Sequence, residues 1–317
     1  MLLAVSLSAC HSLDDDAQFQ KHTKGFILHV QDTSTNAHKL LYLNSENMNI
    51  SPFSITLDST VAHIVCLDDE LWIPCPNQKC IYIVDLSTRQ IKETLNFGKD
   101  FFPIDLAQHP DKKEWFFIAS ENGKIAFYHR KRKKTEVHTY TSSLNHILFA
   151  NNKLYAASAQ SSDATFIVVD VPTRALIKKE PVNSIKQIYR YVLWVRGFST
   201  DSLPELYSFN VNDDILQKST YTYPLRQAAY SPYGQKFYGK EFIGFVELYH
   251  NKLYVNQSLL PHSEPIQGFI CDFDESKLIV YSKHKLYYYK DLNSKQTKDS
   301  LNIYTNLNII QGVVHRK

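Results

Sequence analysis

The chain has 317 residues, of which 44% are hydrophobic and 13% aromatic, and its formal net charge is +3. This length allows two average domains or one large all-β unit, and so small a net charge gives no support for a nucleic-acid partner. Glycine is scarce, with 9 residues, whereas Tyr and Phe number 20 and 18, and aromatic residues favour strands over helices. No segment beyond the N-terminus resembles a transmembrane helix, so the composition favours an all-β unit.

Residues 1–9, MLLAVSLSA, are small and apolar, which suits the hydrophobic region and cleavage site of a secretory signal peptide. The run is too short to span a bilayer, which needs about 20 apolar residues. Leu7-Ser8-Ala9-Cys10 resembles the lipobox of bacterial lipoproteins, and the resemblance implies cleavage before Cys10 and lipid on its thiol. No Lys or Arg precedes the run, so the basic region is missing and the natural start is expected upstream. The alternative is a frayed N-terminus with an unrelated cysteine.

A polar, acidic segment follows the cysteine and contains Ser12, Asp14, Asp15 and Asp16. It resembles the export signal of surface lipoproteins in one group of Gram-negative bacteria. The resemblance implies a lipid anchor in the outer membrane, with the protein facing the cell exterior. Retention at the inner membrane normally involves an aspartate directly after the cysteine, where this chain has His11. The alternative is that residues 10–24 form only an extended acidic tether.

Residues 25–317 contain a repeat of about 40 residues. IYIVDLSTRQIKETL (81–95) recurs as FIVVDVPTRALIKKE (166–180), with Asp85 and Asp170 in register. Other units place a polar residue or a histidine at this point, and these markers are Asn44, His129, Asn210, His250 and either Lys290 or Asp291. Each marker ends an alternating strand, a polar turn and another strand follow, and two further strands precede it. Seven units of four short strands predict an all-β fold, a seven-bladed β-propeller.

The first unit has only three predicted strands, at 25–31, 39–44 and 53–57. The C-terminal QGVV (311–314) repeats the pattern of QGFI (267–270), which begins an innermost strand. We therefore expect residues 308–315 to complete the first blade as its innermost strand. This pairing would close the ring and remove open sheet edges.

The segment LWIPCPNQKCIYIVDLSTRQIKETLNF (71–97) resembles the YVTN-type repeat of seven-bladed propellers. PIDLAQHPDKKEWFF (103–117) and AAYSPYGQKFY (228–238) resemble another part of the same repeat. The resemblance covers roughly residues 25–315, but Asn, Asp and Lys stand in turns where that family uses glycine. Such repeats are specific for the fold and nearly silent on function.

The repeat alignment brings polar side chains to the start of the innermost strands, at the mouth of the central channel. These candidate binding residues are His63, Asp105, His146, Lys186, Gln187, Arg226, Gln227, Gln267 and Gln311. Polar groups that converge on a cleft indicate a small-molecule site, and the alternative is a water-filled channel without a ligand. No metal is predicted, because metal ligands must lie a few ångströms apart, whereas His63, Asp105 and His146 belong to three consecutive blades.

The sequence contains no G-x-S-x-G, no P-loop, no H-E-x-x-H and no dinucleotide-binding glycine pattern, so it predicts no catalytic residue and no cofactor. Cys75 and Cys80 flank a short turn, and either a disulfide or two thiols would fit there in an oxidising compartment. Cys66 and Cys271 occupy equivalent positions in two blades that are separated by one other blade. We expect their Cα atoms to be farther apart than the limit of about 7 Å for a disulfide. We expect both to be buried thiols.

The basic run HRKRKK (129–134) falls in a turn between the third and fourth strands of a blade. A solvated turn is the first interpretation, and contact with anionic lipid headgroups or surface polysaccharide is the alternative. Nucleic acid is not expected for an exported protein.

The leading hypothesis is a non-catalytic cell-surface lipoprotein whose propeller binds a ligand or an envelope protein partner. The ligand would be a nutrient, an iron chelate or a cofactor, captured beside an outer-membrane transporter. The alternative is a propeller enzyme of the lyase or lactonase type with its site at the channel mouth.

Overall fold

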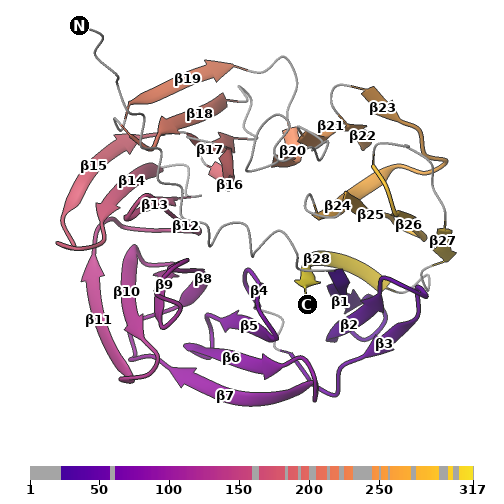
Figure 1. Cartoon of the computed structure of the whole chain (residues 1–317), viewed down its shortest axis with the longest axis horizontal. Helices are drawn as coiled ribbons and strands as arrows, with labels where there is room; N and C mark the ends of the chain where they lie inside the picture. Colours follow the sequence, from indigo (N-terminus) through magenta and orange to yellow (C-terminus); the bar gives the residue numbers. More distant parts are fainter. Residues whose placement is uncertain are drawn as a thin grey trace, which may run out of the picture.

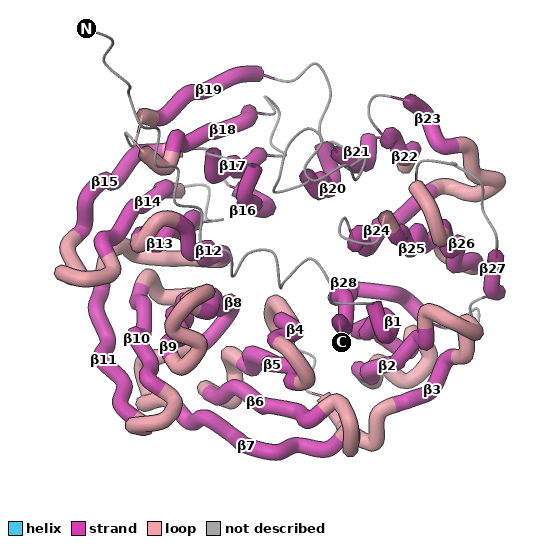
Figure 2. Tube along the Cα trace, in the orientation of Figure 1, coloured by secondary structure: helices cyan, strands magenta, loops and turns pink. Residues whose placement is uncertain are grey.

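The computed structural model is all-β, with seven four-stranded antiparallel sheets arranged around a common centre (Figure 1). The described residues are 23–57, 61–158, 164–182, 185–191, 194–199, 205–212, 215–220, 225–230, 245–249, 251–255, 258–272, 276–292, 299–302 and 307–316. In this part of the chain Figure 2 shows strands and loops only, and no helix there is long and apolar enough to cross a bilayer. The predicted all-β, propeller-like fold of seven four-stranded units is therefore confirmed.

Each sheet, called a blade below, is ordered from its innermost to its outermost strand. The first blade contains β28 (Leu307–Arg316), β1 (Thr23–Asp32), β2 (His38–Asn44) and β3 (Ile50–Pro52). The second contains β4 (Val65–Leu67), β5 (Glu70–Cys75), β6 (Cys80–Asp85) and β7 (Gln90–Asn96). The third contains β8 (Pro103–Gln108), β9 (Trp115–Ser120), β10 (Lys124–His129) and β11 (Lys134–Thr139).

The remaining four blades follow the same order. The fourth contains β12 (His146–Ala150), β13 (Lys153–Ala157), β14 (Thr165–Asp170) and β15 (Leu176–Pro181), and the fifth contains β16 (Ile185–Tyr191), β17 (Trp194–Ser199), β18 (Glu205–Asn210) and β19 (Leu216–Thr220). The sixth contains β20 (Leu225–Tyr230), β21 (Phe245–Tyr249), β22 (Lys252–Val255) and β23 (Ser258–Leu260), and the seventh contains β24 (Ile266–Asp272), β25 (Lys277–Ser282), β26 (Lys285–Tyr289) and β27 (Asp299–Asn302).

The markers Asn44, Asp85, His129, Asp170 and Asn210 are each the last residue of the third strand of a blade, directly before the turn. The Asp85 carboxylate accepts the backbone N–H groups of Ser87 and Thr88 at 2.8 and 3.0 Å, and Asp170 accepts that of Thr173 at 2.8 Å. Hydrogen bonds from the Ser87 hydroxyl and these N–H groups lower the pKa of Asp85 to about 2. A side-chain acceptor that satisfies turn N–H groups explains why Asp and Asn recur here. The same role is taken by Asn44, His129 and Asn210.

Four residues after the marker, these turns reach the left-handed region without glycine. The residues are Met48, Arg89, Lys133 and Arg174, with φ between 49° and 64°. Glycine adopts such angles at no steric cost. Because glycine is scarce in this chain, these turns close with larger residues in a strained conformation. One predicted marker is wrong: His250 itself lies outside the described residues, but the strand before it, β21, is the second of its blade rather than the third.

The hydrophobic core lies between blades rather than within one. Each apolar cluster combines residues of two neighbouring blades, and stacked rings mark the contacts. Trp72 stacks on Phe116 at 4.3 Å between the second and third blades, and Phe166 stacks on Phe209 at 4.5 Å between the fourth and fifth. Burial of large aromatic rings is the main source of stability in such a junction.

The C-terminal strand β28 pairs with β1 in the first blade, with Gln311 opposite His29, and contacts the innermost strands β24 and β4. Ile310 is an unpaired bulge residue in this ladder, and Ile309 pairs with Val30. Ile310 is 42% exposed, whereas Ile309 is buried. The predicted outermost strand of this blade, 53–57, is wrong: β3 lies before it at Ile50–Pro52, and Leu57 makes an isolated bridge with His38.

A chain of polar contacts joins β28 to β1, to β2 and to the segment before β4. The Gln311 amide nitrogen donates to the Ala62 carbonyl at 2.6 Å and to His29 Nδ1 at 3.2 Å, while its oxygen accepts the Ile64 N–H at 3.1 Å. Because Nδ1 of His29 is the acceptor, its Nε2 carries the proton and donates to His38 at 2.9 Å. All hydrogen-bonding positions of the Gln311 amide nitrogen are therefore used, and the segment around residue 63 is held in place.

Ending the chain at residue 306 should destabilise the protein severely. The deletion exposes the edge of β1 and removes the buried Ile309 and the Gln311 contacts, so we expect a loss of at least about 5 kcal/mol. Thermal unfolding followed by circular dichroism should show a Tm lower by about 10 °C or more. Deletion of residues 11–20, the sequence-predicted tether, is the control. Equal Tm values for the chain ending at 306 and the full chain would contradict a structural role of β28.

Acid should destabilise the protein through His29. Burial, with a smaller effect of His38, lowers the pKa of His29 to about 4, so the folded state binds this proton less readily than the unfolded state. The stabilisation is complete above pH 6.5 and is lost as the pH falls towards 4, by roughly 3 kcal/mol in total. In urea unfolding at stepped pH, His29→Gln should flatten this dependence, while exposed His284→Gln should not. An unchanged slope in His29→Gln would contradict the assignment.

Candidate functional site

Three of the predicted mouth residues meet near the centre of the molecule. His63 precedes β4, Asp105 lies in β8 and His146 begins β12, and these three innermost strands lie side by side (Figure 1). One ligand atom of each residue lies within 4.8 Å of the others. The expectation that three consecutive blades hold these residues too far apart for a metal is therefore wrong. Innermost strands converge on the centre, so equivalent side chains approach closely there.

The cluster has two buried members and one exposed member. Asp105 and His146 are 7% and 4% exposed, whereas His63 is exposed. His146 Nδ1 lies 3.6 Å from Asp105 Oδ2, and the rings of His63 and His146 meet edge to face at 4.5 Å. A carboxylate and two imidazoles thus surround one small volume that opens towards solvent on the His63 side.

The Asp105 carboxylate is held by backbone donors. Its Oδ1 accepts the N–H of Leu106 at 2.8 Å, and its Oδ2 accepts the N–H of Ile147 in the next blade at 3.0 Å. A bulge at Ile104 directly precedes it in β8, and bulges re-aim the neighbouring side chain. The strand therefore turns Asp105 towards the fourth blade and not into its own sheet.

The position of His63 is fixed by its backbone. Its N–H donates to the Ile104 carbonyl at 3.0 Å, and Gln311 binds the peptide groups on both sides of it, at Ala62 and Ile64. The surrounding protein withdraws water from the ring and lowers its pKa, an effect that the Asp105 charge opposes and His146 reinforces. A lowered pKa favours the neutral imidazole, the form that has a lone pair for a ligand.

The other predicted mouth residues fall into three groups. Gln311 is bonded within the framework and offers little to a ligand, whereas Gln267 is exposed at the bulge of β24. Lys186 and Gln187 lie in β16, and Arg226 and Gln227 in β20, but the side chains of all four lie outside the described part. Cys10, Ser12, Asp14, Asp15 and Asp16 also lie outside the described residues.

Cys75 and Cys80 face one another across the β5–β6 hairpin. Both are buried and present as thiols, and burial raises the pKa of Cys80. Opposed residues of antiparallel strands have Cα atoms about 4.5–5.5 Å apart, a separation that also suits a disulfide, so the bridge stays a prediction for an oxidising compartment. Cys66 and Cys271 are half-buried rather than buried as expected.

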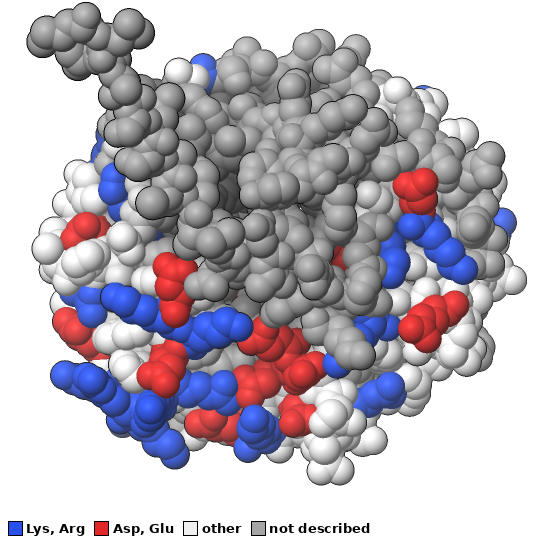
Figure 3. All heavy atoms as spheres, in the orientation of Figure 1, with Lys and Arg blue, Asp and Glu red and all other residues white. Residues whose placement is uncertain are grey.

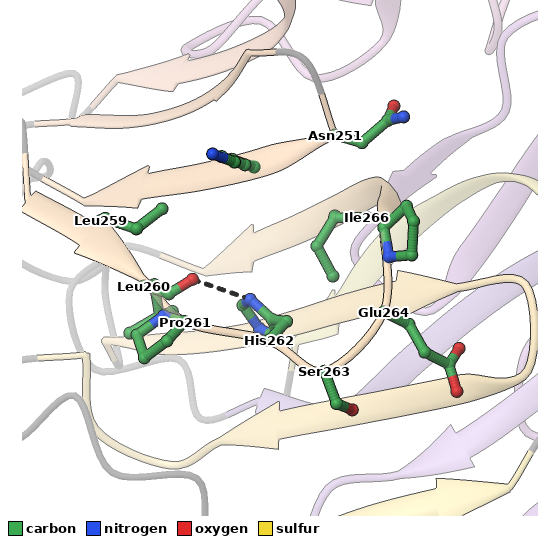
Figure 4. A pocket seen from close by; sticks show the side chains of 10 residues that line it. Asn251, Leu259, Leu260, Pro261, His262, Ser263, Glu264 and Ile266 are labelled. Atoms are coloured by element: carbon green, nitrogen blue, oxygen red, sulfur yellow. Dashed lines mark hydrogen bonds between the residues drawn. The ribbon is translucent and has the colours of Figure 1, made fainter.

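A pocket of about 410 Å³ lies away from the mouth, between β22, β23 and the segment that leads to β24 (Figure 4). His262 lies in it, donates from Nδ1 to the Leu260 carbonyl at 2.9 Å and accepts at Nε2 from the Tyr289 hydroxyl at 2.9 Å. Glu264 accepts from the Ser282 hydroxyl. Sequence reasoning missed this pocket, and the only signal was a His and a Glu between two prolines, Pro261 and Pro265. The His262 and Glu264 side chains are hydrogen-bonded within the protein. The pocket is therefore a weaker candidate for a binding site than the channel mouth.

The basic run lies in the turn between β10 and β11, as predicted, but it is not purely solvated. Arg130 forms a two-point ion pair with Glu70 of the second blade at 2.6 and 2.9 Å and lies 5.5 Å from the Trp72 ring. The face seen in Figure 3 carries basic and acidic side chains interspersed. The turn therefore helps to join two blades, and in the described part of this face both signs of charge are mixed.

Comparison with known proteins supports the fold only. No family model matches the chain, and no curated protein matches it either. A chain in the crystal structure of the mitotic checkpoint complex is similar in structure, with a TM-score of 0.61. The match covers 96% of this chain and 99% of that chain at 11% sequence identity. At this identity the likeness shows a shared propeller-like fold and nothing about activity or partners.

Proposed function

We propose that the protein is a non-catalytic β-propeller lipoprotein on the outer face of a bacterial outer membrane. The observation that carries the proposal is the order of features along the chain. A lipobox-like Cys10 and the acidic run Asp14–Asp16 stand directly before a propeller-like unit whose first strand begins at Thr23. The YVTN-like repeat in residues 25–315 supports the same assignment.

The intervening chain is long enough to act as a tether. Residues 11–22 separate the cysteine from β1, and such a segment spans up to about 40 Å when extended. Repulsion between the neighbouring aspartates favours extension. The propeller would then stand clear of the lipid surface, with β28 paired to β1 in the first blade.

The channel mouth is the proposed binding surface. The exposed His63 and Gln267 come from different blades and both lie at innermost strands, which is the arrangement of a site shared between blades. The ligand would be a nutrient, an iron chelate or a cofactor passed to an outer-membrane transporter, or the occupant would be an envelope protein. Propellers commonly serve as rigid platforms, and the absence of catalytic sequence motifs supports binding over chemistry.

The lipid anchor is tested by metabolic labelling. Palmitate should enter the wild-type protein expressed from its own gene, and Cys10→Ser should remain unlabelled because it lacks the thiol that carries the lipid. Replacing Asp14, Asp15 and Asp16 by Ala should keep the label and reduce protease accessibility on intact cells. Equal labelling of wild type and Cys10→Ser would refute the anchor, and unchanged accessibility of the triple variant would reduce the aspartates to a tether.

The mouth is tested by site-specific photo-cross-linking in intact cells. A photoreactive residue at Gln267, exposed on the innermost strand β24, should yield an adduct with an envelope protein. The matched control is Val137, which is 47% exposed on the outermost strand β11 and should yield none. Adducts from position 137 alone would place the partner on the outer edge and contradict binding of a protein at the mouth.

A further inference from the structure

We propose that His63, Asp105 and His146 bind one divalent transition-metal ion at the channel mouth. Two imidazole nitrogens and one carboxylate oxygen form a donor set that suits Zn²⁺ and its neighbours in the first transition row. Ca²⁺ and Mg²⁺ prefer sites made of oxygen ligands alone. The site does not depend on the lipid anchor or on any partner, so it stands or falls separately from the proposed function.

The distances are close to those of a bound site. Three ligand atoms within 4.8 Å of one another surround a common centre. A tetrahedral Zn²⁺ at about 2.0–2.1 Å from each ligand would set the ligand atoms about 3.4 Å apart. His146 Nδ1 and Asp105 Oδ2 are already 3.6 Å apart. We expect rotation of the exposed His63 ring to supply the remaining adjustment.

Backbone contacts outside the ligand set hold the ligands in position. The Asp105 carboxylate accepts the N–H groups of Leu106 and Ile147, which leaves further lone pairs on its oxygens because a carboxylate has about four such sites. The segment that carries His63 is clamped on both sides by Gln311. Orientation of ligands by outer contacts is a regular feature of metal sites.

The coordination would be incomplete on the solvent side. Three protein ligands leave at least one position open on a four-coordinate ion. Asp105 and His146 are buried beneath, whereas His63 is exposed, so the open position faces the channel. A small anion or a chelating ligand could bind there directly.

Isothermal titration of the chelator-stripped full chain with Zn²⁺ tests the site. We expect one ion per chain with saturable binding, and at least a tenfold weaker affinity in His63→Gln and in Asp105→Asn. Exposed His284→Gln, on another blade, is the control and should bind as wild type does. Co²⁺ in place of Zn²⁺ should give a visible spectrum that changes in His63→Gln, which a merely structural role of the residue would not produce.

Either of two results overturns the proposal: no saturable Zn²⁺ binding to the wild type, or equal affinity in wild type and His63→Gln. The second comparison is safe against misfolding because the His63 side chain is exposed. Asp105→Asn has one side-chain oxygen in place of two, so it loses one of the two N–H contacts and can fail to fold. In that case His63→Gln and His63→Ala decide the question. Their folding is checked by unchanged Tm in the absence of metal.

Discussion

Hydrogen bonds that cross from one innermost strand to the next set the register of neighbouring blades. No β-ladder joins the seven sheets in the described part of the chain, and apolar packing supplies contact area without direction. Directional contacts between blades come from the Asp105 carboxylate and the Gln311 amide. Asp105 accepts the N–H of Ile147 in the following blade. Gln311 accepts the N–H of Ile64 in the same way. Both acceptors follow a bulge in their strands. The same local geometry therefore serves two different junctions.

The chemistry of the acceptor decides whether such a position can also bind a ligand. The Gln311 amide nitrogen donates both its hydrogens within the protein, to the Ala62 carbonyl and to His29. Its role is therefore structural. Asp105 meets the same demand with one lone pair on each oxygen and keeps others available. A buried carboxylate with two imidazoles beside it also carries a charge that a cation would compensate. Structural and binding roles thus coincide at Asp105 and separate at Gln311.

The local features of the fold could be predicted from the sequence, because they arise from local chemistry. Asp85 and Asp170 accept turn N–H groups wherever the repeat places them, so their spacing reveals the strands. The register of β28 could not be predicted to the residue, since the bulge at Ile310 shifts pairing without changing composition. The separation of His63 and His146 was misjudged for a related reason. Spacing along the chain says nothing about how tightly innermost strands converge.

The geometry of the mouth also bears on the choice between binding and catalysis. Reversible coordination needs only ligands and an open position, whereas a lyase or lactonase also needs a group that transfers a proton. Among the described mouth residues, the three cluster members would all serve as ligands, and Gln311 is committed to the framework. Gln267 carries an amide, which does not exchange a proton at neutral pH. In the described part of the mouth, the groups outside the proposed ligand set are therefore amides, and proton transfer would fall to a water bound at the open position of the metal.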